Sequence, residues 1–233
     1  MTGTRSHPNP ALRPLRPPPG AGAPSLWYRF MRRFFQATMC ALWTVRVFDR
    51  HHEPAAGSAV YICNHQSFLD PMLMSFALRR PMHYMARDSL FRLPGFRGLI
   101  RSLNAFPVRR GRADTAAIKE AMRRLRAGGQ VVVFPEGTRT RDGRIGPFLP
   151  GVAVLSQRAA DWTVPVLIDG AFEAWPRSQR LPGPGSVVVR YGRAIGRDEA
   201  RQVRPGEFAA RVRAELIALQ AETRRRVGRP ALQ

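Results

Sequence analysis

The sequence has little cysteine. Its 233 residues contain two, Cys40 and Cys63, which form no Cys-x-x-Cys pair and stand in apolar segments. A disulfide framework and a cysteine-based zinc site are therefore excluded, and a reducing compartment is favoured. His51, His52 and Glu53 are adjacent in the chain, but no further Cys or His cluster completes a ligand set. We predict no metal and no bound cofactor.

Lysine and acidic residues are also scarce. Lys119 is the only lysine, and 38 Lys+Arg against 16 Asp+Glu give a net charge of +22. A GC-rich genome explains arginine in place of lysine, but it does not explain the excess charge. Such an excess favours an anionic partner: nucleic acid, an anionic membrane surface or a phosphorylated substrate. No helix-turn-helix, RNP or zinc-finger signature accompanies the charge, so we expect no nucleic acid partner.

No apolar run reaches the roughly 20 residues that cross a bilayer as a helix. Residues 1–24 hold seven prolines, which predicts a disordered extension. Residues 25–47 have helical periodicity, with Trp27, Phe30 and Phe34 near one face. We predict that this helix lies in the membrane interface and makes the protein peripheral or monotopic on the cytoplasmic face of the cell membrane. The alternative is a helix packed on the domain.

The remaining chain alternates short β-rich runs with helical patterns, which predicts an α/β domain over residues 48–228 with a mixed, mainly parallel sheet flanked by helices. The clearest helix follows the N-cap Asp114 and stops at Gly128, and a last amphipathic helix covers 207–226. The predicted strands are Ala59–Cys63, Met82–Ala86, Ala105–Val108, Gln130–Phe134, Thr163–Ile168 and Ser186–Arg190.

The first candidate site residues follow the strand Ala59–Cys63, at His65 and Asp70. A histidine at a strand end can take a proton from a hydroxyl, and a carboxylate five positions later can return to its other ring nitrogen. Two alternatives remain from these residues alone. Asp70 before Pro71 is also a common helix start, and His65 could be a hydrogen-bonded core histidine.

The second candidate segment follows the strand Gln130–Phe134, at Pro135–Arg144. A glycine-containing loop brings backbone N–H groups close to an anion, and arginine offers a planar fork to phosphate. A further cationic patch, Arg109 to Arg112, follows another short strand. Three strand ends thus offer a base and two arginine loops.

These motifs resemble those of the glycerolipid acyltransferases of the lysophosphatidic acid acyltransferase type. The family signatures Asn-His-x4-Asp and Phe-Pro-Glu-Gly-Thr-Arg stand unbroken at residues 64–70 and 134–139. Residues 106–110 resemble its arginine block and 164–166 its fourth, proline-containing block. The similarity covers about residues 45–195, and order and spacing also agree.

The resemblance implies that His65 is the general base and Asp70 its orienting partner. It implies a site for the acceptor phosphate shaped by Arg110, Glu136, Gly137, Thr138 and Arg139. One departure concerns the acceptor: many bacterial members carry a basic residue where Leu149 follows Phe148 here. Arg141 or Arg144 could supply the missing charge.

We therefore expect acyl transfer from acyl-CoA or acyl carrier protein to the sn-2 hydroxyl of 1-acylglycerol-3-phosphate, giving phosphatidic acid. Other acceptors stay open: glycerol 3-phosphate, another lysophospholipid or a lyso-aminolipid. Cys63 is a minor alternative nucleophile, and a noncatalytic membrane-surface protein is a rival from another class. The sequence sets neither the acyl chain length nor the oligomeric state.

Overall fold

The computed structural model describes residues 24–109, 114–149 and 151–232. The predicted disordered extension therefore lies almost wholly outside the described residues. The strands are β1 Trp43–Phe48, β2 Ala59–Cys63, β3 Met82–Arg87, β4 Ala105–Val108, β5 Gln130–Val133, β6 Trp162–Asp169, β7 Gly185–Tyr191 and β8 Ile195–Gly196. The α-helices are α1 Leu26–Leu42, α2 Asp70–Ala77, α3 Pro94–Ser102, α4 Thr115–Arg126, α5 Gly151–Arg158, α6 Ala171–Ala174, α7 Arg197–Arg201 and α8 Pro205–Arg226, and two 3-10 turns are η2 Arg50–His52 and η3 Asp88–Arg92.

The strands form one eight-stranded sheet in the order β1-β7-β6-β2-β5-β3-β4, with β8 beside β6. The pairs β1/β7, β6/β2, β2/β5, β5/β3 and β3/β4 are parallel, whereas β6/β7 and β6/β8 are antiparallel. This confirms the predicted mixed, mainly parallel sheet. All five residues of β2 are buried, as expected for a strand covered on both faces.

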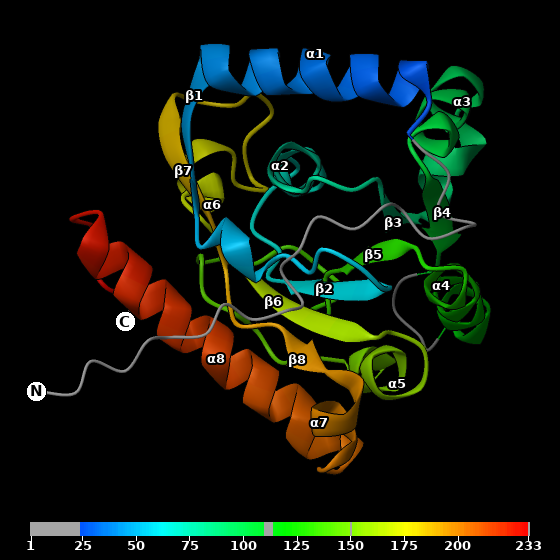
Figure 1. Ribbon diagram of the computed structural model, residues 1–233. Helices are drawn as coiled ribbons and strands as arrows, with labels where there is room; N and C mark the ends of the chain where they lie inside the picture. Colours follow the sequence, from blue (N-terminus) through cyan, green and yellow to red (C-terminus); the bar gives the residue numbers. More distant parts are fainter. Residues whose placement is uncertain (1–23, 110–113, 150, 233) are drawn as a thin grey trace, which may run out of the picture.

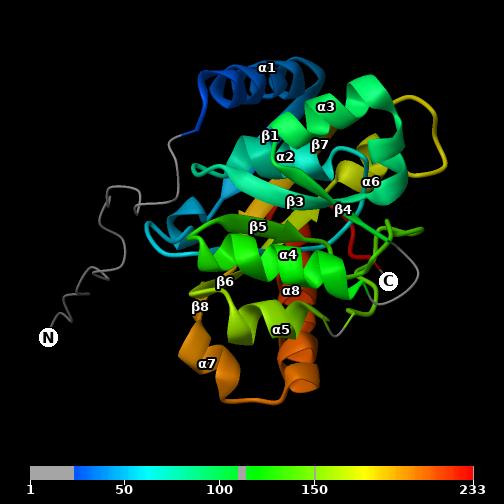
Figure 2. The same ribbon diagram turned by 90° about the vertical axis from the view of Figure 1, so that its right-hand side faces the viewer.

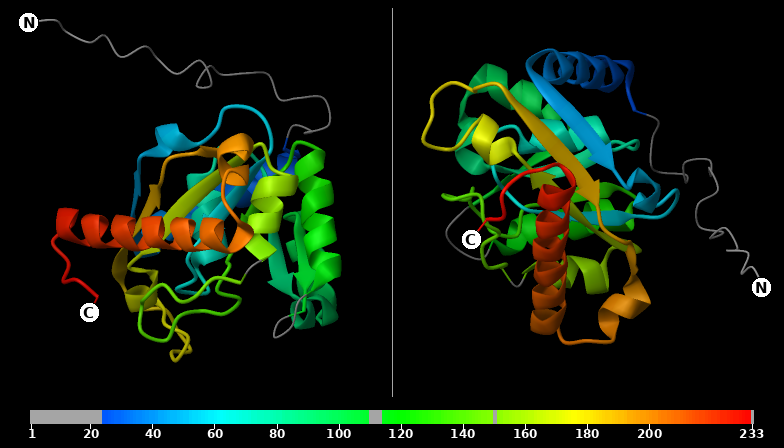
Figure 3. Two further views of the ribbon diagram at one scale, coloured as in Figure 1. Left: turned by 90° about the horizontal axis from the view of Figure 1, so that it is seen from below. Right: turned by 90° about the vertical axis from the view of Figure 1, so that its left-hand side faces the viewer.

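Two layers of helices cover the sheet (Figures 1 and 2). Helices α1, α2 and α3 lie on one face, and α4, α5 and α8 lie on the other, where α8 crosses the sheet (Figure 3). Each face has its own apolar cluster, around Leu73 and Met74 of α2 on one side and around Phe208 and Leu216 of α8 on the other. The amphipathic pattern predicted for the last helix is confirmed, because Phe208, Val212 and Leu216 are buried and Leu219 is partly buried.

The helix predicted over residues 25–47 is too long, because α1 ends at Leu42 and the chain continues as β1. Thr44, Val45 and Val47 are β-branched and favour an extended backbone, and β1 pairs in parallel with β7 from Trp43 to Phe48. The boundary at residue 48 is also wrong, since β1 belongs to the sheet of the domain.

Helix α1 has one packed side and one exposed side. Tyr28, Met31 and Met39 are buried, and the Tyr28 hydroxyl accepts a hydrogen bond from the Met82 amide at 3.2 Å. Trp27, Phe30 and Phe34, the apolar residues predicted to share one face, do not pack on the domain, because all three are exposed. Within the described residues, no helix is both long enough and apolar enough to cross a membrane.

Candidate active site

The first motif forms the turn from β2 into α2, and it brings His65 and Asp70 together. Oδ2 of Asp70 lies 2.7 Å from Nδ1 of His65 and accepts hydrogen bonds from the Gln66 and Ser67 amides at 2.7 and 2.8 Å. Asp70 is fully buried and occupies the first position of α2, but the N-cap is Leu69 and the Asp70 carboxylate makes no capping bond, so it pairs with His65 instead of capping the helix. The carboxylate fixes the turn and the imidazole at once.

The imidazole of His65 has two fixed neighbours, the Asp70 carboxylate and the Phe134 ring. Its ring stacks on Phe134 with centroids 4.3 Å apart, and only 7% of its side chain is exposed. No hydrogen bond to Nε2 is found within the described part of the chain. With Nδ1 turned to Asp70, Nε2 is the atom that can receive a proton from a substrate hydroxyl.

The second motif supports the first through Glu136. One carboxylate oxygen accepts from the His65 amide at 2.8 Å and the other from the Gly146 amide at 3.0 Å. Burial raises the pKa of Glu136, and the hydrogen bonds from the two amides oppose that shift. Glu136 thus acts on His65 through its backbone rather than presenting a free carboxylate to a ligand.

The loop after β5 needs glycine at position 137. Gly137 has φ +67°, in the left-handed region, and a Cβ there would lie 3.1 Å from Cδ1 of Leu149. The Thr140 amide donates to the His65 carbonyl at 2.8 Å, which fastens the loop to the first motif. Because β5 is the direct neighbour of β2, the two motifs meet at one edge of the sheet.

The remaining predicted residues lie at different distances from His65. The Arg139 guanidinium carbon stands 3.4 Å from the centre of the Phe68 ring, which is half exposed, so it reaches the motif that carries His65. Thr138 is exposed on the loop. Arg110 lies outside the described residues, but β4, which precedes it, is the edge strand and is separated from β2 by β5 and β3.

Two polar residues of the first motif have tasks that the sequence did not reveal. Asn64 exchanges two hydrogen bonds of 2.8 Å with the backbone of Ile168 in β6. Gln66 donates to the Gly143 carbonyl at 3.1 Å and accepts from the Phe172 amide at 3.2 Å. Both are buried, and they tie the turn to three other segments. Their position inside a motif was the only available signal.

The alternative nucleophile Cys63 and the nearby hydroxyl of Ser67 are not presented to a substrate. Cys63 is fully buried, and burial raises the pKa of its thiol well above the ordinary range. Ser67 is fully buried, and its hydroxyl donates to the Trp175 carbonyl at 2.8 Å. The amides of Gln66 and Ser67 in the same turn donate to Asp70. His65 is therefore the group best placed for proton transfer.

The comparisons agree with this geometry. A protein-family model described as acyltransferase matches residues 44–169, more than half of the chain. The chain belongs to the acyltransferase family. The matched range includes both motifs and the strands β2, β5 and β6 that carry and flank them, so the family assignment and the site concern the same part of the fold.

Several proteins with assigned names are similar to this family member. The chloroplastic 1-acyl-sn-glycerol-3-phosphate acyltransferase of Arabidopsis thaliana is 31% identical over 134 residues, covering 56% of this chain and 37% of that protein. The 1-acyl-sn-glycerol-3-phosphate acyltransferase of Bacillus subtilis is 27% identical, covering 61% of this chain and 71% of that protein. The chain thus spans well under half of its plant relative.

A solved structure shows the same fold. The crystal structure of the 1-acyl-sn-glycerophosphate acyltransferase from Thermotoga maritima superposes with a TM-score of 0.66 at 23% identity. The superposition covers 83% of this chain and 80% of the other. The α/β architecture is therefore that of a known acyltransferase structure.

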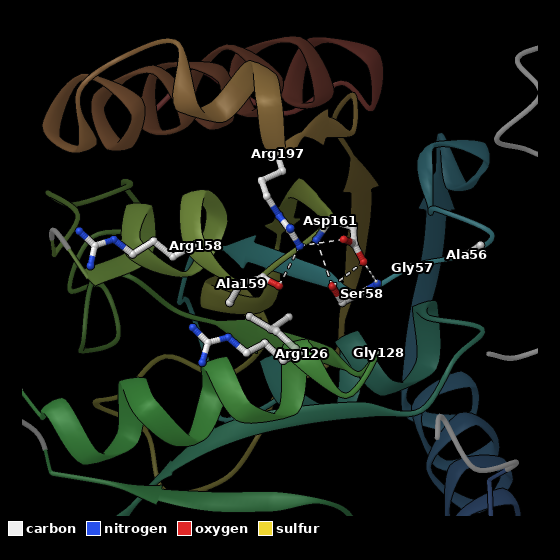
Figure 4. A pocket seen from close by; sticks show the side chains of 10 residues that line it. Ala56, Gly57, Ser58, Arg126, Gly128, Arg158, Ala159, Asp161 and Arg197 are labelled. Carbon is white, nitrogen blue, oxygen red and sulfur yellow. Dashed lines mark hydrogen bonds and ion pairs between the residues drawn. The ribbon is translucent and has the colours of Figure 1, made fainter. Parts of the chain in front are cut away.

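A separate cleft lies at the opposite edge of the sheet, where β2, β5 and β6 begin (Figure 4). It has a volume of about 510 Å³ and is lined by Ser58, Asp161, Arg197 and neighbouring residues. Asp161 joins its walls by accepting from Ser58 and from Arg197, each at 2.8 Å. None of the predicted site residues that the structure describes lines this cleft, so it is distinct from the site around His65.

Proposed function

We propose that the chain transfers a fatty acyl group from a thioester, acyl-CoA or acyl carrier protein, to the sn-2 hydroxyl of 1-acylglycerol-3-phosphate, giving phosphatidic acid. The observation that carries the proposal is the union of both motifs at one sheet edge. Asp70 faces Nδ1 of His65, while Glu136 of the second motif holds the His65 backbone. The names of the Arabidopsis and Bacillus relatives support the acceptor.

The reaction proceeds by direct transfer in this proposal. Nε2 of His65 takes the proton of the acceptor hydroxyl as its oxygen attacks the thioester carbonyl carbon. Asp70 accepts from Nδ1–H and stabilises the imidazolium. The tetrahedral intermediate then collapses, the C–S bond breaks, and the leaving thiolate takes the proton from Nε2. No covalent enzyme intermediate is needed, because the thioester is already activated.

The acceptor phosphate is assigned to the loop that carries the second motif. Gly137 allows a close approach of the backbone, and the Arg139 guanidinium lies beside the motif of His65. Arg141 and Arg144 are exposed on the same loop and add positive charge. Arg110 belongs to the proposal through the family resemblance alone. Leu149 is exposed beside Gly137, where it adds apolar surface instead of charge.

The proposal includes a membrane-bound acceptor and a peripheral location on the cytoplasmic face. α1 exposes Trp27, Phe30 and Phe34 together with Arg29 and Arg33. Aromatic and arginine side chains on one helix suit the headgroup region of an anionic bilayer. The hydroxyl of a lysophospholipid in that bilayer would then reach His65 without leaving the membrane surface.

Purified full-length protein should be tested with lysophosphatidate, glycerol 3-phosphate and lysophosphatidylcholine, each with acyl-CoA and with acyl carrier protein donors. Preferential formation of phosphatidate supports the proposal. A preference for glycerol 3-phosphate would mean that the acceptor is glycerol 3-phosphate instead. Another relative, named probable glycerol-3-phosphate acyltransferase 2 of Arabidopsis thaliana, is 34% identical over 110 residues. Absence of transfer with every pair would refute the enzymatic proposal.

A further inference from the structure

The exposed apolar surface of the molecule continues beyond α1. Most of the large apolar side chains that are exposed in the described part of the chain belong to α1 or to the segment η3–α3, residues 88–102. In that segment Leu90, Leu93 and Phe96 are 36%, 57% and 43% exposed. Leu90 lies in η3, Leu93 is the extended residue between η3 and α3, and Phe96 lies in the first turn of α3. α3 is largely unpacked, and Ile100 is its buried residue.

Helices α1 and α3 lie next to each other on the same face of the sheet (Figures 1 and 2). The Trp27 indole N–H donates to the Ser102 hydroxyl at 2.8 Å, which joins the start of α1 to the end of α3. The two exposed apolar surfaces thus belong to one layer of the molecule. We call this layer, formed by α1, η3 and α3, the outer helical layer.

The strand directions place this layer at the edge of the active site. β3 runs parallel to β5, and β5 runs parallel to β2, so η3 begins at the edge where His65 follows β2. β1 runs opposite to β2, because β7 is antiparallel to β6, so the end of α1 also reaches that edge. Leu42, at this end of α1, is half exposed. The apolar ends of both segments therefore lie at the same edge of the sheet as the site.

The charge of the outer helical layer fits one kind of partner. α1 and α3 contain no acidic residue, and Asp88 is the acidic residue of η3. Arg29 and Arg33 of α1 and Arg97 and Arg101 of α3 are exposed. Apolar side chains among arginines match the interface of an anionic bilayer, where each arginine near the surface adds electrostatic attraction.

We propose that η3–α3 is a second membrane-contact element, which binds an anionic phospholipid bilayer beside α1 through Leu90, Leu93 and Phe96. This inference rests on the proposed function, and it adds the orientation of the protein on the bilayer. With two contacts, the bilayer meets the molecule on both sides of the carboxyl edge of β2 and β5. A lysophospholipid hydroxyl at the surface then lies on the side from which His65 is approached.

The test is vesicle binding by the full chain, with vesicles of phosphatidylcholine alone and of phosphatidylcholine with phosphatidylglycerol. The variant Leu93→Ser/Phe96→Ser should weaken binding to the anionic vesicles about tenfold, because it removes two apolar side chains from the interface. Ile217→Ser is the matched control, since Ile217 is 40% exposed on α8, on the other face of the sheet. It should bind as the wild type does.

Phe30→Ser/Phe34→Ser on α1 separates this inference from the proposed function. Weakened binding in the α1 variant with unchanged binding in the α3 variant overturns the second contact alone. Unchanged binding in both variants also removes the membrane contact of the proposed function. Equal weakening by Ile217→Ser would mean that the effect is not specific to the outer helical layer, and it would overturn the inference.

Self-association through the same surface is the competing explanation. If the wild type is dimeric without vesicles, and Leu93→Ser/Phe96→Ser makes it monomeric while vesicle binding stays unchanged, a second copy covers the surface and the inference is wrong. Thermal unfolding of each variant checks the fold, because exposed substitutions of this kind should leave the midpoint close to that of the wild type.

Discussion

Oε1 of Glu136 accepts a hydrogen bond from the backbone amide of His65 at 2.8 Å. The carboxylate of the second motif therefore holds the residue that the first motif contributes. The other oxygen holds Gly146, ten residues further along the same loop. The two motifs therefore form one structural unit, so a substitution in either should change the position of the His65 imidazole.

The stability contribution of Glu136 should depend on pH. Burial raises its pKa above the ordinary value of 4.5, so the folded protein binds the proton more tightly than the unfolded chain does. Its stabilising contribution is then greatest below pH 4.5 and is lost as the pH rises through the folded pKa.

The free energy of unfolding of the wild type minus that of Glu136→Gln should therefore decrease as the pH rises above 4.5. Denaturant unfolding of both proteins over a pH series measures this difference. A difference that increases with pH would show that the hydrogen bonds from His65 and Gly146 outweigh burial.

Asp70→Asn should lower kcat by about 10²- to 10⁴-fold and leave the KM for the acceptor nearly unchanged. The reason is that a neutral amide side chain cannot stabilise the imidazolium, although it keeps an oxygen for the amides of the turn. Asp198→Asn is the control, because Asp198 is exposed on α7, away from the site. Wild-type kcat in Asp70→Asn would remove Asp70 from the mechanism.

Gly137→Ala should raise the KM for the acceptor and destabilise the loop by about 1–2 kcal/mol, since alanine disfavours a positive φ. Part of the effect comes from the contact with Leu149. Gly137→Ala/Leu149→Ala removes that contact and should recover only part of the loss. Gly206→Ala in α8, where a Cβ meets open space, is the control for a glycine substitution as such. Kinetics in which Gly137→Ala behaves like Gly206→Ala would show that the loop tolerates a side chain.

Cys63→Ala should retain the kcat of the wild type and lose about 1 kcal/mol of stability from the shortened core side chain. In the native protein iodoacetamide should modify the exposed Cys40 and not Cys63, whose thiol is buried. Mass spectrometry of the alkylated protein gives the sites. Loss of acyl transfer in a folded Cys63→Ala variant would support the alternative in which Cys63 is the nucleophile.

The sequence predicted the strands that carry the site because their signals are local. Ala59–Cys63 and Ala105–Val108 have the predicted bounds, and the other four predicted strands differ by one residue at one or both ends. β1 was missed because it follows α1 directly, and no glycine or proline marks the end of the helix at Leu42. Its extended form depends on pairing with β7, about 140 residues away, and pairing at that separation leaves no local signal.

The site followed the same division. His65 and Asp70 are only five positions apart, and the single turn from β2 to α2 brings them together. Their spacing was therefore informative. The bonds that Glu136, Asn64 and Gln66 make connect segments that meet only in the fold. The side-chain amide of Gln66, for example, reaches Gly143, 77 residues along the chain. Spacing alone could not have predicted these supporting contacts.

The most direct test of the account is the rate of acyl transfer to lysophosphatidate by His65→Ala, measured beside the wild type and with thermal unfolding to verify the fold. If Nε2 of His65 takes the hydroxyl proton, kcat should fall by at least about 10²-fold while the variant stays folded. A folded His65→Ala protein with wild-type kcat would contradict the central claim that His65 is the general base.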